Sequence, residues 1–279
     1  RLVSHPGDLA QELSAAVGLS PADLGQTLAN VKADMAGKHG FLVQQLRRCS
    51  SCPAAADALL VLPGLDGKLF VIGGFTAADG FSSSAECLDL ETWQWSEVDP
   101  MSTPREAAGA AVLGRKIFVV GGYDERDQIL SSVESFDPAT GIWTAVTPMN
   151  TARFSHGVVS AQGKLFAVGG VNNQDGTLSS VECFDPSTRV WSNIAALSTA
   201  RSSLAVAVLG DKLYAIGGKE SFFQSLSSVE CLDLSVPNSQ WTTVAPMTSP
   251  RYGMGAVVTG GKIYVAGGPG SSSIECFDP

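Results

Sequence analysis

The sequence predicts an all-β propeller built from repeats of about 48 residues. Three features predict it: a short apolar segment that ends in paired glycines, four strand-like segments in each repeat, and a tryptophan that recurs in the last of these segments. Sequence self-similarity at a fixed period of this size indicates a repeat architecture. The glycine pairs are spaced 48, 48, 48 and 50 residues apart, and their first members are Gly73, Gly121, Gly169, Gly217 and Gly267.

Each repeat contains the elements of one propeller blade. In the second repeat, the small apolar residues of "PREAAGAAVLG" are followed by "KIFVV", by the glycine pair and by the polar loop "YDERDQILS". The segments "SVESFDP" and "IWTAV" complete the repeat. Four short strands separated by turn residues, repeated along a chain, are typical of propeller blades.

The residue types at repeated positions agree with stacked sheets. The segment before the glycines is apolar on both faces, as a sheet between two other sheets requires. Glycine permits a positive φ or a close approach that a Cβ would block. A large indole on the fourth strand can cover the junction between blades. The recurring tryptophans are Trp95, Trp143, Trp191 and Trp241.

A glutamate recurs on the third predicted strand, and we interpret it as a structural hydrogen-bond acceptor rather than a catalyst. It occurs as Glu86, Glu134, Glu182, Glu230 and Glu275. The position directly after the glutamate accepts either cysteine or serine, so we interpret the cysteines there as compact packing residues. These are Cys87, Cys183, Cys231 and Cys276, with Ser135 in the second repeat.

Together these motifs resemble the kelch repeat over residues 56–279. The matching run is Pro-Arg, an apolar strand, Lys-(Ile/Leu)-(Phe/Tyr)-x-(Val/Ile)-Gly-Gly, Ser-Ser-Val-Glu-x-Phe-Asp-Pro and Trp. The resemblance implies a kelch β-propeller with five visible repeats: four complete four-stranded blades and one that lacks its outer strand. The predicted repeats are about 56–103, 104–151, 152–199, 200–249 and 250–279.

Two repeats depart from the pattern. In the first, Asp57 occupies the position of the repeated arginine, and Pro63 interrupts the predicted first strand. In the fifth, the loop after the glycines is five residues shorter, and the sequence reaches Pro279 just before the fourth strand. Because kelch rings usually have six or seven blades, we expect either further sequence beyond Pro279 or an unusual closure.

Residues 1–55 are predicted to form a helical N-terminal segment and a linker. Apolar residues recur at helical spacing in 7–17, and Ser20 followed by Pro21 is typical of a helix start. We expect these short α-helices to serve docking or oligomerisation, or to be the tail of a preceding helical domain. The alternative is that they pack on the propeller or form a loosely ordered leader. Cys49 and Cys52 form a C-x-x-C pair with no second pair at zinc spacing, so we interpret them as incidental thiols of the linker.

Composition narrows the classes of partner. The net charge of −9 argues against general nucleic-acid binding, which needs a basic face. No apolar run approaches the roughly 18 residues of a membrane span, so we expect no membrane association. The cysteine pattern indicates a reducing compartment, and we expect a cytoplasmic protein, with a nuclear location as the alternative.

The resemblance also implies a binding site at the rim of the propeller channel. In kelch adaptor proteins, the repeated arginine, the residue after it and the aromatic residue after the glycine pair line a pocket for acidic peptides. The corresponding positions are Arg105, Arg153, Arg201 and Arg251; Glu106, Phe154, Ser202 and Tyr252; and Phe75 and Tyr123. Val171, Lys219 and Pro269 depart from the aromatic pattern, and Asp57 and Glu106 add negative charge.

Converging arginines can bind carboxylates through paired, charge-assisted hydrogen bonds. The alternative is that each arginine ties loop carbonyls at the start of its own blade. We keep both interpretations, since four copies at one structural position fit either. We therefore expect a protein or peptide partner, with acidic side chains under the first interpretation.

We predict a protein-interaction module rather than an enzyme, with no catalytic residue, metal or cofactor. The resemblance implies a substrate adaptor for ubiquitination or, alternatively, an actin or cytoskeletal scaffold. A third alternative is a kelch-type enzyme acting on a small anionic sugar. A copper site would require clustered histidine and tyrosine, and His156 is the only histidine within the repeats. His156 follows Arg153 closely, so it is included among the rim candidates, with an acid–base role as one option.

Overall fold

The computed structural model describes residues 60–65, 67–76, 80–92, 94–221, 223–269 and 273–279, and these residues form strands, turns and loops without a helix. Five antiparallel sheets form five blades, four of them with four strands and the fifth with three. This confirms the predicted fold class. The expected N-terminal helices and the Cys49–Cys52 pair lie outside the described residues. Within the described ranges, no helix has the length and apolar character that a membrane crossing needs.

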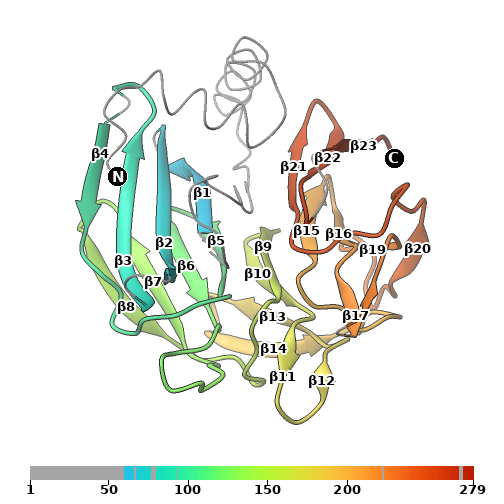
Figure 1. Ribbon diagram of the computed structural model, residues 1–279, viewed down its shortest axis with the longest axis horizontal. Helices are drawn as coiled ribbons and strands as arrows, with labels where there is room; N and C mark the ends of the chain where they lie inside the picture. Colours follow the sequence, from blue (N-terminus) through green and yellow to red (C-terminus); the bar gives the residue numbers. More distant parts are fainter. Residues whose placement is uncertain (1–59, 66, 77–79, 93, 222, 270–272) are drawn as a thin grey trace.

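The first strand of each blade lies nearest the centre (Figure 1): β1 (Leu60–Leu65), β5 (Gly109–Leu113), β9 (Gly157–Ala161), β15 (Ala205–Leu209) and β21 (Gly255–Thr259). The second strands are β2 (Lys68–Thr76), β6 (Lys116–Val120), β10 (Lys164–Val168), β16 (Lys212–Ile216) and β22 (Lys262–Ala266). The third strands are β3 (Gly80–Asp89), β7 (Val133–Asp137), β13 (Val181–Asp185), β19 (Val229–Asp233) and β23 (Ile274–Phe277). The outer strands are β4 (Gln94–Val98), β8 (Ile142–Val146), β14 (Val190–Ile194) and β20 (Thr242–Val244).

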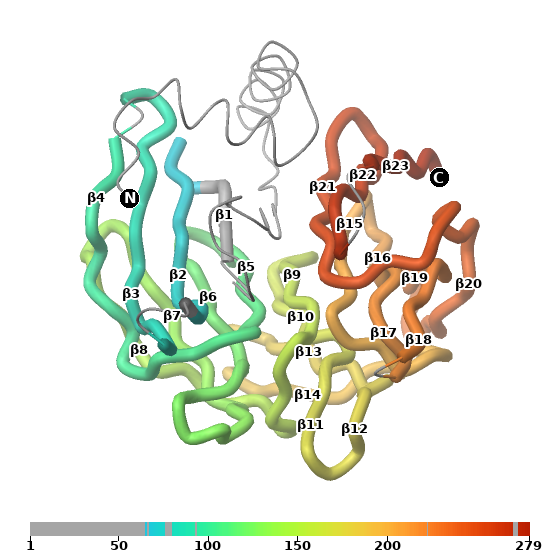
Figure 2. The backbone as a smooth tube through the Cα atoms, in the orientation of Figure 1, coloured from blue at the N-terminus to red at the C-terminus, as the bar shows by residue number. Residues whose placement is uncertain are grey.

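The blades follow one another in chain order around an arc, from blade 1 at the left of the view to blade 5 at the right (Figures 1 and 2). Successive first strands contact each other, in the order β1, β5, β9, β15 and β21. Two further hairpins extend blades 3 and 4 beyond their glycine pairs. They are β11 (Val171–Asn172) with β12 (Gly176–Thr177), and β17 (Lys219–Ser221) with β18 (Gln224–Ser225).

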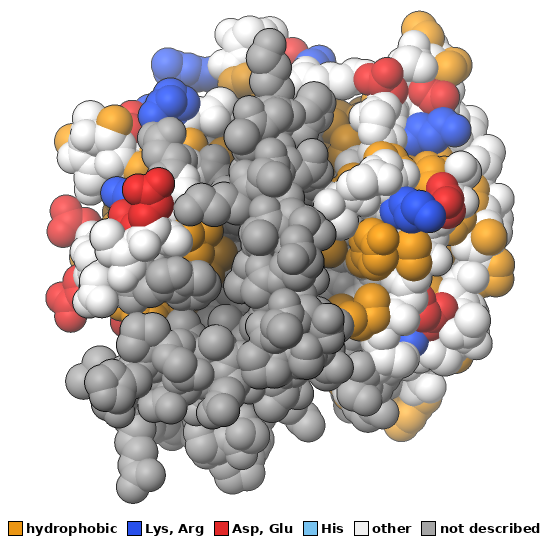
Figure 3. All heavy atoms as spheres, turned by 90° about the horizontal axis from the view of Figure 1, so that it is seen from above, with side chains coloured by type: hydrophobic (Ala, Val, Ile, Leu, Met, Phe, Trp, Pro, Cys, Tyr) orange, Lys and Arg blue, Asp and Glu red, His pale blue; other side chains and the backbone are white. Residues whose placement is uncertain are grey.

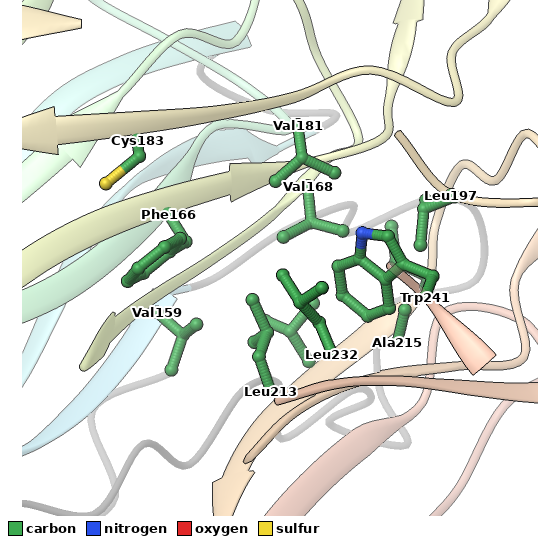
Figure 4. Packing of buried hydrophobic residues seen from close by; sticks show 12 residues of the cluster. Val159, Phe166, Val168, Val181, Cys183, Leu197, Leu213, Ala215, Leu232 and Trp241 are labelled. Carbon is green, nitrogen blue, oxygen red and sulfur yellow. The ribbon is translucent and has the colours of Figure 1, made fainter. Parts of the chain in front are cut away.

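The apolar core lies between the blades. Four clusters of buried side chains fill the junctions between successive sheets. Between blades 3 and 4, Phe166 and Val168 of β10 pack against Leu213 of β16 and Leu232 of β19 (Figure 4). Burial of each such side chain contributes about 1.5–3 kcal/mol. A sheet that is covered on both faces therefore needs apolar residues on both faces, which is the pattern in the sequence.

The glycine pairs sit where the backbone of one blade meets the next. Gly121 and Gly122 have φ values of 62° and 92°. A Cβ on Gly121 would lie 2.5 Å from the carbonyl oxygen of Arg153, and the amide of Gly122 donates to that same oxygen at 2.9 Å. The pair therefore allows the close approach that joins blade 2 to blade 3, and equivalent bonds join the other blades.

Blade 5 differs because no described sheet covers its outward face. Ile274 is 41% exposed, whereas Val229 at the equivalent position in blade 4 is 5% exposed. Tyr264 is half-buried, whereas its counterpart Tyr214 is buried. The view from above shows hydrophobic side chains gathered on the side of the molecule where blades 4 and 5 lie (Figure 3).

In blade 1, β1 continues through Pro63, and its pairing with β2 shifts register between Pro63 and Leu65. Proline is tolerated in this strand because it lies at the edge of its sheet.

The repeated tryptophans of blades 2, 3 and 4 connect each of these blades to the preceding one. The indole of Trp191, on the outer strand of blade 3, is 4% exposed and donates to the carbonyl of Thr147 at 2.9 Å. Trp143 and Trp241 make the equivalent bonds to Asp99 and Ala195. The indole thus combines apolar burial with a hydrogen bond that satisfies its N–H.

We expect Trp191→Phe to lower the free energy of unfolding by about 1–2 kcal/mol, because it removes the bond to Thr147 and part of the buried surface. Trp191→Ala should cost about 3–5 kcal/mol. Chemical denaturation measures both. Trp95→Phe is the matched control because Trp95 is 43% exposed. Equal losses of unfolding free energy for Trp191→Phe and Trp95→Phe would contradict the role of Trp191 in connecting blades 2 and 3.

Candidate functional site

The four repeated arginines are buried inside their blades. Arg153 is 0% exposed, and its Nη1 donates to the carbonyls of Gly169 at 2.8 Å and Ser180 at 3.0 Å. Its Nη2 donates to Ser180 Oγ at 3.1 Å and Glu182 Oε1 at 2.8 Å. Arg105, Arg201 and Arg251 repeat these contacts and are at most 4% exposed.

These contacts correct the expectation that the guanidinium groups line a ligand pocket. A ligand at the rim cannot reach a guanidinium that is enclosed by its own blade and already engaged on both terminal nitrogens. The contacts agree with the alternative interpretation, in which each arginine ties carbonyls of its blade.

Each arginine is paired with the repeated glutamate, which acts as the structural acceptor expected from the sequence. Glu182 accepts from Arg153 and from the amides of Asn150 and Thr151, in the loop that leads into blade 3. In blade 2, burial raises the pKa of Glu134, but hydrogen bonds from Ser102 and the charge of Arg105 outweigh it and hold the pKa below its ordinary value. The pair of Arg105 and Glu134 is therefore ionised and locally neutral.

We expect Arg153→Ala to destabilise the protein by about 3–5 kcal/mol, because it leaves the Glu182 carboxylate buried without a cation. Arg153→Lys should also destabilise it, since one ammonium cannot replace the two-pronged donor. Thermal unfolding measures the loss. An Arg153→Ala protein with unchanged stability would show that the pair does not brace the blade.

In blades 2, 3 and 4, the residue after the arginine pairs with the residue after the glycine pair. Backbone bridges with bonds of 2.8–3.1 Å join Glu106 to Tyr123, Phe154 to Val171, and Ser202 to Lys219. Each bridge anchors the first residue of a loop or hairpin, and the pairs Tyr123–Ile129, Val171–Thr177 and Lys219–Ser225 close these loops. We call these projections, together with the end of the β2–β3 hairpin, the rim loops, and their described residues are 75–76, 80–81, 123–130, 171–178, 219–221 and 223–226. Ser202 itself is buried. Lys219 places its ammonium 3.8 Å from the ring centroid of Tyr252, which links blade 4 to blade 5.

A row of aromatic rings runs along the rim loops from blade 1 to blade 3. Phe75 and Phe81, opposite each other in the β2–β3 hairpin, have ring centroids 5.3 Å apart. Phe81 lies 5.5 Å from Tyr123, and Tyr123 lies 5.2 Å from Phe154, all edge to face. All four rings are half-buried, so part of each remains at the surface. We call these four residues the aromatic row.

Phe81 was not among the residues singled out from the sequence. The predicted strand ended at the glycine pair, whereas β2 and β3 continue past it and pair Phe75 with Phe81. The signal that could have found it is the placement of two phenylalanines at either end of the short segment "TAADG". The structure thus brings together Phe75, Tyr123 and Phe154 of the predicted rim residues and adds Phe81.

His156 lies between blades 2 and 3 rather than in a pocket. It is 6% exposed, and neither ring nitrogen has a hydrogen-bond partner of good geometry. Its ring packs where Gly109 and Gly121 leave room, close to both backbones. Burial and, to a smaller extent, the charge of Arg153 lower the pKa of His156 to about 3, against a small opposing effect of the Val120 backbone. The neutral imidazole therefore acts as a packing group.

His156 should make stability depend on pH. Its pKa in the folded state lies far below the ordinary value of 6.5, so protons bind the unfolded chain more readily. The stabilisation is complete above about pH 6.5 and is lost as the pH falls toward 3. Between about pH 7 and pH 5 we expect a loss of roughly 2 kcal/mol, measured by denaturation at each pH.

The control for this prediction is His156→Leu, because Leu204 is the buried equivalent in blade 4. This variant should lose most of the pH dependence in the same window. A wild-type protein whose stability is flat between pH 7 and 5 would contradict the buried neutral imidazole.

The described residues contain no cluster of three or more His, Cys, Asp or Glu that could hold a metal ion. All four cysteines in the described ranges are free thiols, and three of them are buried.

The blades and their bracing define the class of protein as a kelch-type β-propeller. The model of the KLHDC2/KLHL20/DRC7 Kelch-repeats domain matches residues 45–218, and that of the Kelch motif matches residues 200–248. The chain therefore belongs to the kelch-repeat family.

Among solved structures, the chain is similar to that of YjhT, with 21% identity and a TM-score of 0.67 over 78% of this chain and 74% of that one. At this identity the likeness shows the fold alone. No curated protein has a significant match to the sequence.

Proposed function

We propose that this kelch propeller binds a protein partner through its rim loops. The kelch fold supports a protein-interaction module in general. The observation that carries the rim assignment is the aromatic row, because four adjacent rings that stay partly at the surface offer rigid apolar contacts. Tyrosine and phenylalanine supply much of the energy in protein interfaces at a low entropic cost.

Further apolar surface is available on the same set of loops. Phe223, in the β17–β18 hairpin, is 94% exposed. Strand β12 contacts β17, so the loops of blades 3 and 4 adjoin each other. The contact of Phe81 with Tyr123 joins the loops of blades 1 and 2. Tyr123 also contacts Phe154, which is bridged to the loop of blade 3 at Val171. The rim loops thus present one continuous surface rather than separate tips.

The rim assignment can be tested by affinity capture from cell extract with the full chain and mass spectrometry. Tyr123→Ser/Phe154→Ser should reduce capture of the specific partner by about tenfold or more, because interface aromatic residues often contribute about 2 kcal/mol or more. The matched control is Ile142→Ser/Val190→Ser, since these outer-strand residues are 58% and 53% exposed.

The wild type, the rim variant and the control variant must each show a thermal unfolding transition, which establishes that they are folded. Capture lost only in the rim variant supports the proposal. Equal capture by the wild type and both variants would move the interaction to another surface.

The more specific role that we propose is that of a substrate adaptor for ubiquitination in the cytoplasm. The family resemblance supports it, as do the free thiols, which suit a reducing compartment. The partner captured through the rim would then accumulate when the chain is depleted from cells, and its ubiquitination would fall. Unchanged abundance and ubiquitination would reject the adaptor role while leaving rim binding in place.

His156 gives no support to the alternative of an acid–base enzyme. Its ring is enclosed between blades 2 and 3, and burial holds its pKa near 3. A general base must reach the proton that it abstracts and titrate near the working pH.

A further inference from the structure

We infer that the rim loops recognise a basic segment of the partner, with arginine or lysine beside an apolar or aromatic side chain. This inference rests on the proposed function and reverses the acidic partner expected from the repeated arginines. It follows from which charges reach the surface of the rim and from where they stand relative to the aromatic row.

The four arginines do not contribute to the charge that a partner meets. Each lies within 2.5–2.9 Å of a glutamate carboxylate inside its blade, and the guanidinium side chains are at most 2% exposed. A cation and an anion at this distance form a neutral dipole, whose field falls off much faster with distance than that of a single charge. The field at the rim is therefore set by the side chains of the loops.

Those side chains are mostly acidic. The described residues of the rim loops carry five carboxylates and two cations: Asp124, Glu125, Asp127, Asp175 and Glu220 against Arg126 and Lys219. All of the carboxylates except the half-buried Asp124 are on exposed residues. The positive charge of Lys219 is held over the ring of Tyr252. The net charge of the whole chain, −9, has the same sign.

The acidic residues adjoin the aromatic row. Tyr123 is followed directly by Asp124, Glu125 and Asp127 in one loop, whose shape is fixed by bonds from the amides of Arg126 and Gln128 to Asp124 Oδ1 at 2.9 and 3.0 Å. A guanidinium suits such a surface, because it can stack on a ring and bind carboxylates with its planar donors. An acidic segment would meet repulsion at the same place.

The charges also argue against two other occupants. A second copy of the chain carries the same net charge of −9 and would bring acidic rim loops against acidic rim loops. A nucleic acid would place phosphates against the same carboxylates. A basic segment of another protein is the occupant whose charge complements the rim.

The test uses a phage-displayed library of random peptides, selected on the full chain. Enriched peptides are then synthesised, and their affinities are measured by fluorescence anisotropy at low and high salt. We expect peptides rich in Arg or Lys with a neighbouring aromatic or large apolar residue. Their binding should weaken about tenfold or more with Tyr123→Ser/Phe154→Ser. It should also weaken as salt screens the charges.

The charge contribution is measured separately with Glu125→Gln/Asp127→Asn, which removes two carboxylates and leaves Asp124 to hold the loop. Asparagine tolerates the φ of 57° at position 127. We expect a loss of roughly three- to tenfold at low salt. The matched control, Glu91→Gln/Glu97→Gln, removes two exposed carboxylates from blade 1 away from the rim and should leave affinity unchanged.

The outcomes separate the two proposals. Acidic or neutral peptides that depend on the aromatic row but not on Glu125 and Asp127 would overturn the basic segment and keep rim binding. Peptides whose affinity is unaffected by Tyr123→Ser/Phe154→Ser would overturn both. A selection that enriches no peptide would also overturn the inference.

Discussion

The buried pair of arginine and glutamate is the interaction on which the rest of each braced blade depends. One guanidinium holds the end of the second strand and the start of the third, and its carboxylate holds the loop that leads into the blade. Desolvation of two charges is costly, and it is offset only where nearly all their hydrogen bonds are made. Because the carbonyl of Arg153 also accepts the bond from Gly122, the brace fixes the distance between neighbouring blades as well.

This arrangement explains why the rim can carry a binding surface. The backbone bridges at the base of the rim loops stand directly beside the braces, at consecutive residues such as Arg153 and Phe154. A rigid base reduces the entropy lost when the loops bind a partner. In the proposed mode of binding, stability and recognition are therefore divided between adjacent residues such as the buried Arg153 and the half-buried Phe154.

The fold class could be predicted from the sequence, because the repeat period, the glycine pairs and the apolar strands are all visible in local stretches of sequence. It also predicted the structural role of Glu134, Glu182, Glu230 and Glu275 correctly, since a residue repeated at one position of successive blades is expected to have the same structural partner in each. It could not give the direction of the arginine side chains, because a repeated arginine beside a loop suits both a brace and a binding site. The contact of Phe81 with Tyr123 was also out of reach, since it depends on the register of one hairpin and the spacing of two blades.

Because the repeated arginines are buried and the loop carboxylates are exposed, the charges counted in the sequence differ from the charges that lie at the rim surface. Arginine and glutamate are equally visible in the composition, yet the pairs within the blades cancel and the loops keep their carboxylates. Residue types in a motif can thus suggest one class of ligand while the exposed residues between motifs favour another.

The bridges between Glu106 and Tyr123, Phe154 and Val171, and Ser202 and Lys219 anchor the first residues of loops of different sequence in the same way. The tips can therefore be exchanged as cassettes without disturbing the sheets beneath them. A loop grafted between Tyr123 and Leu130 would inherit a fixed anchor, just as hypervariable loops do on an antibody framework. The propeller is, in this sense, a scaffold on which new specificities could be selected one blade at a time.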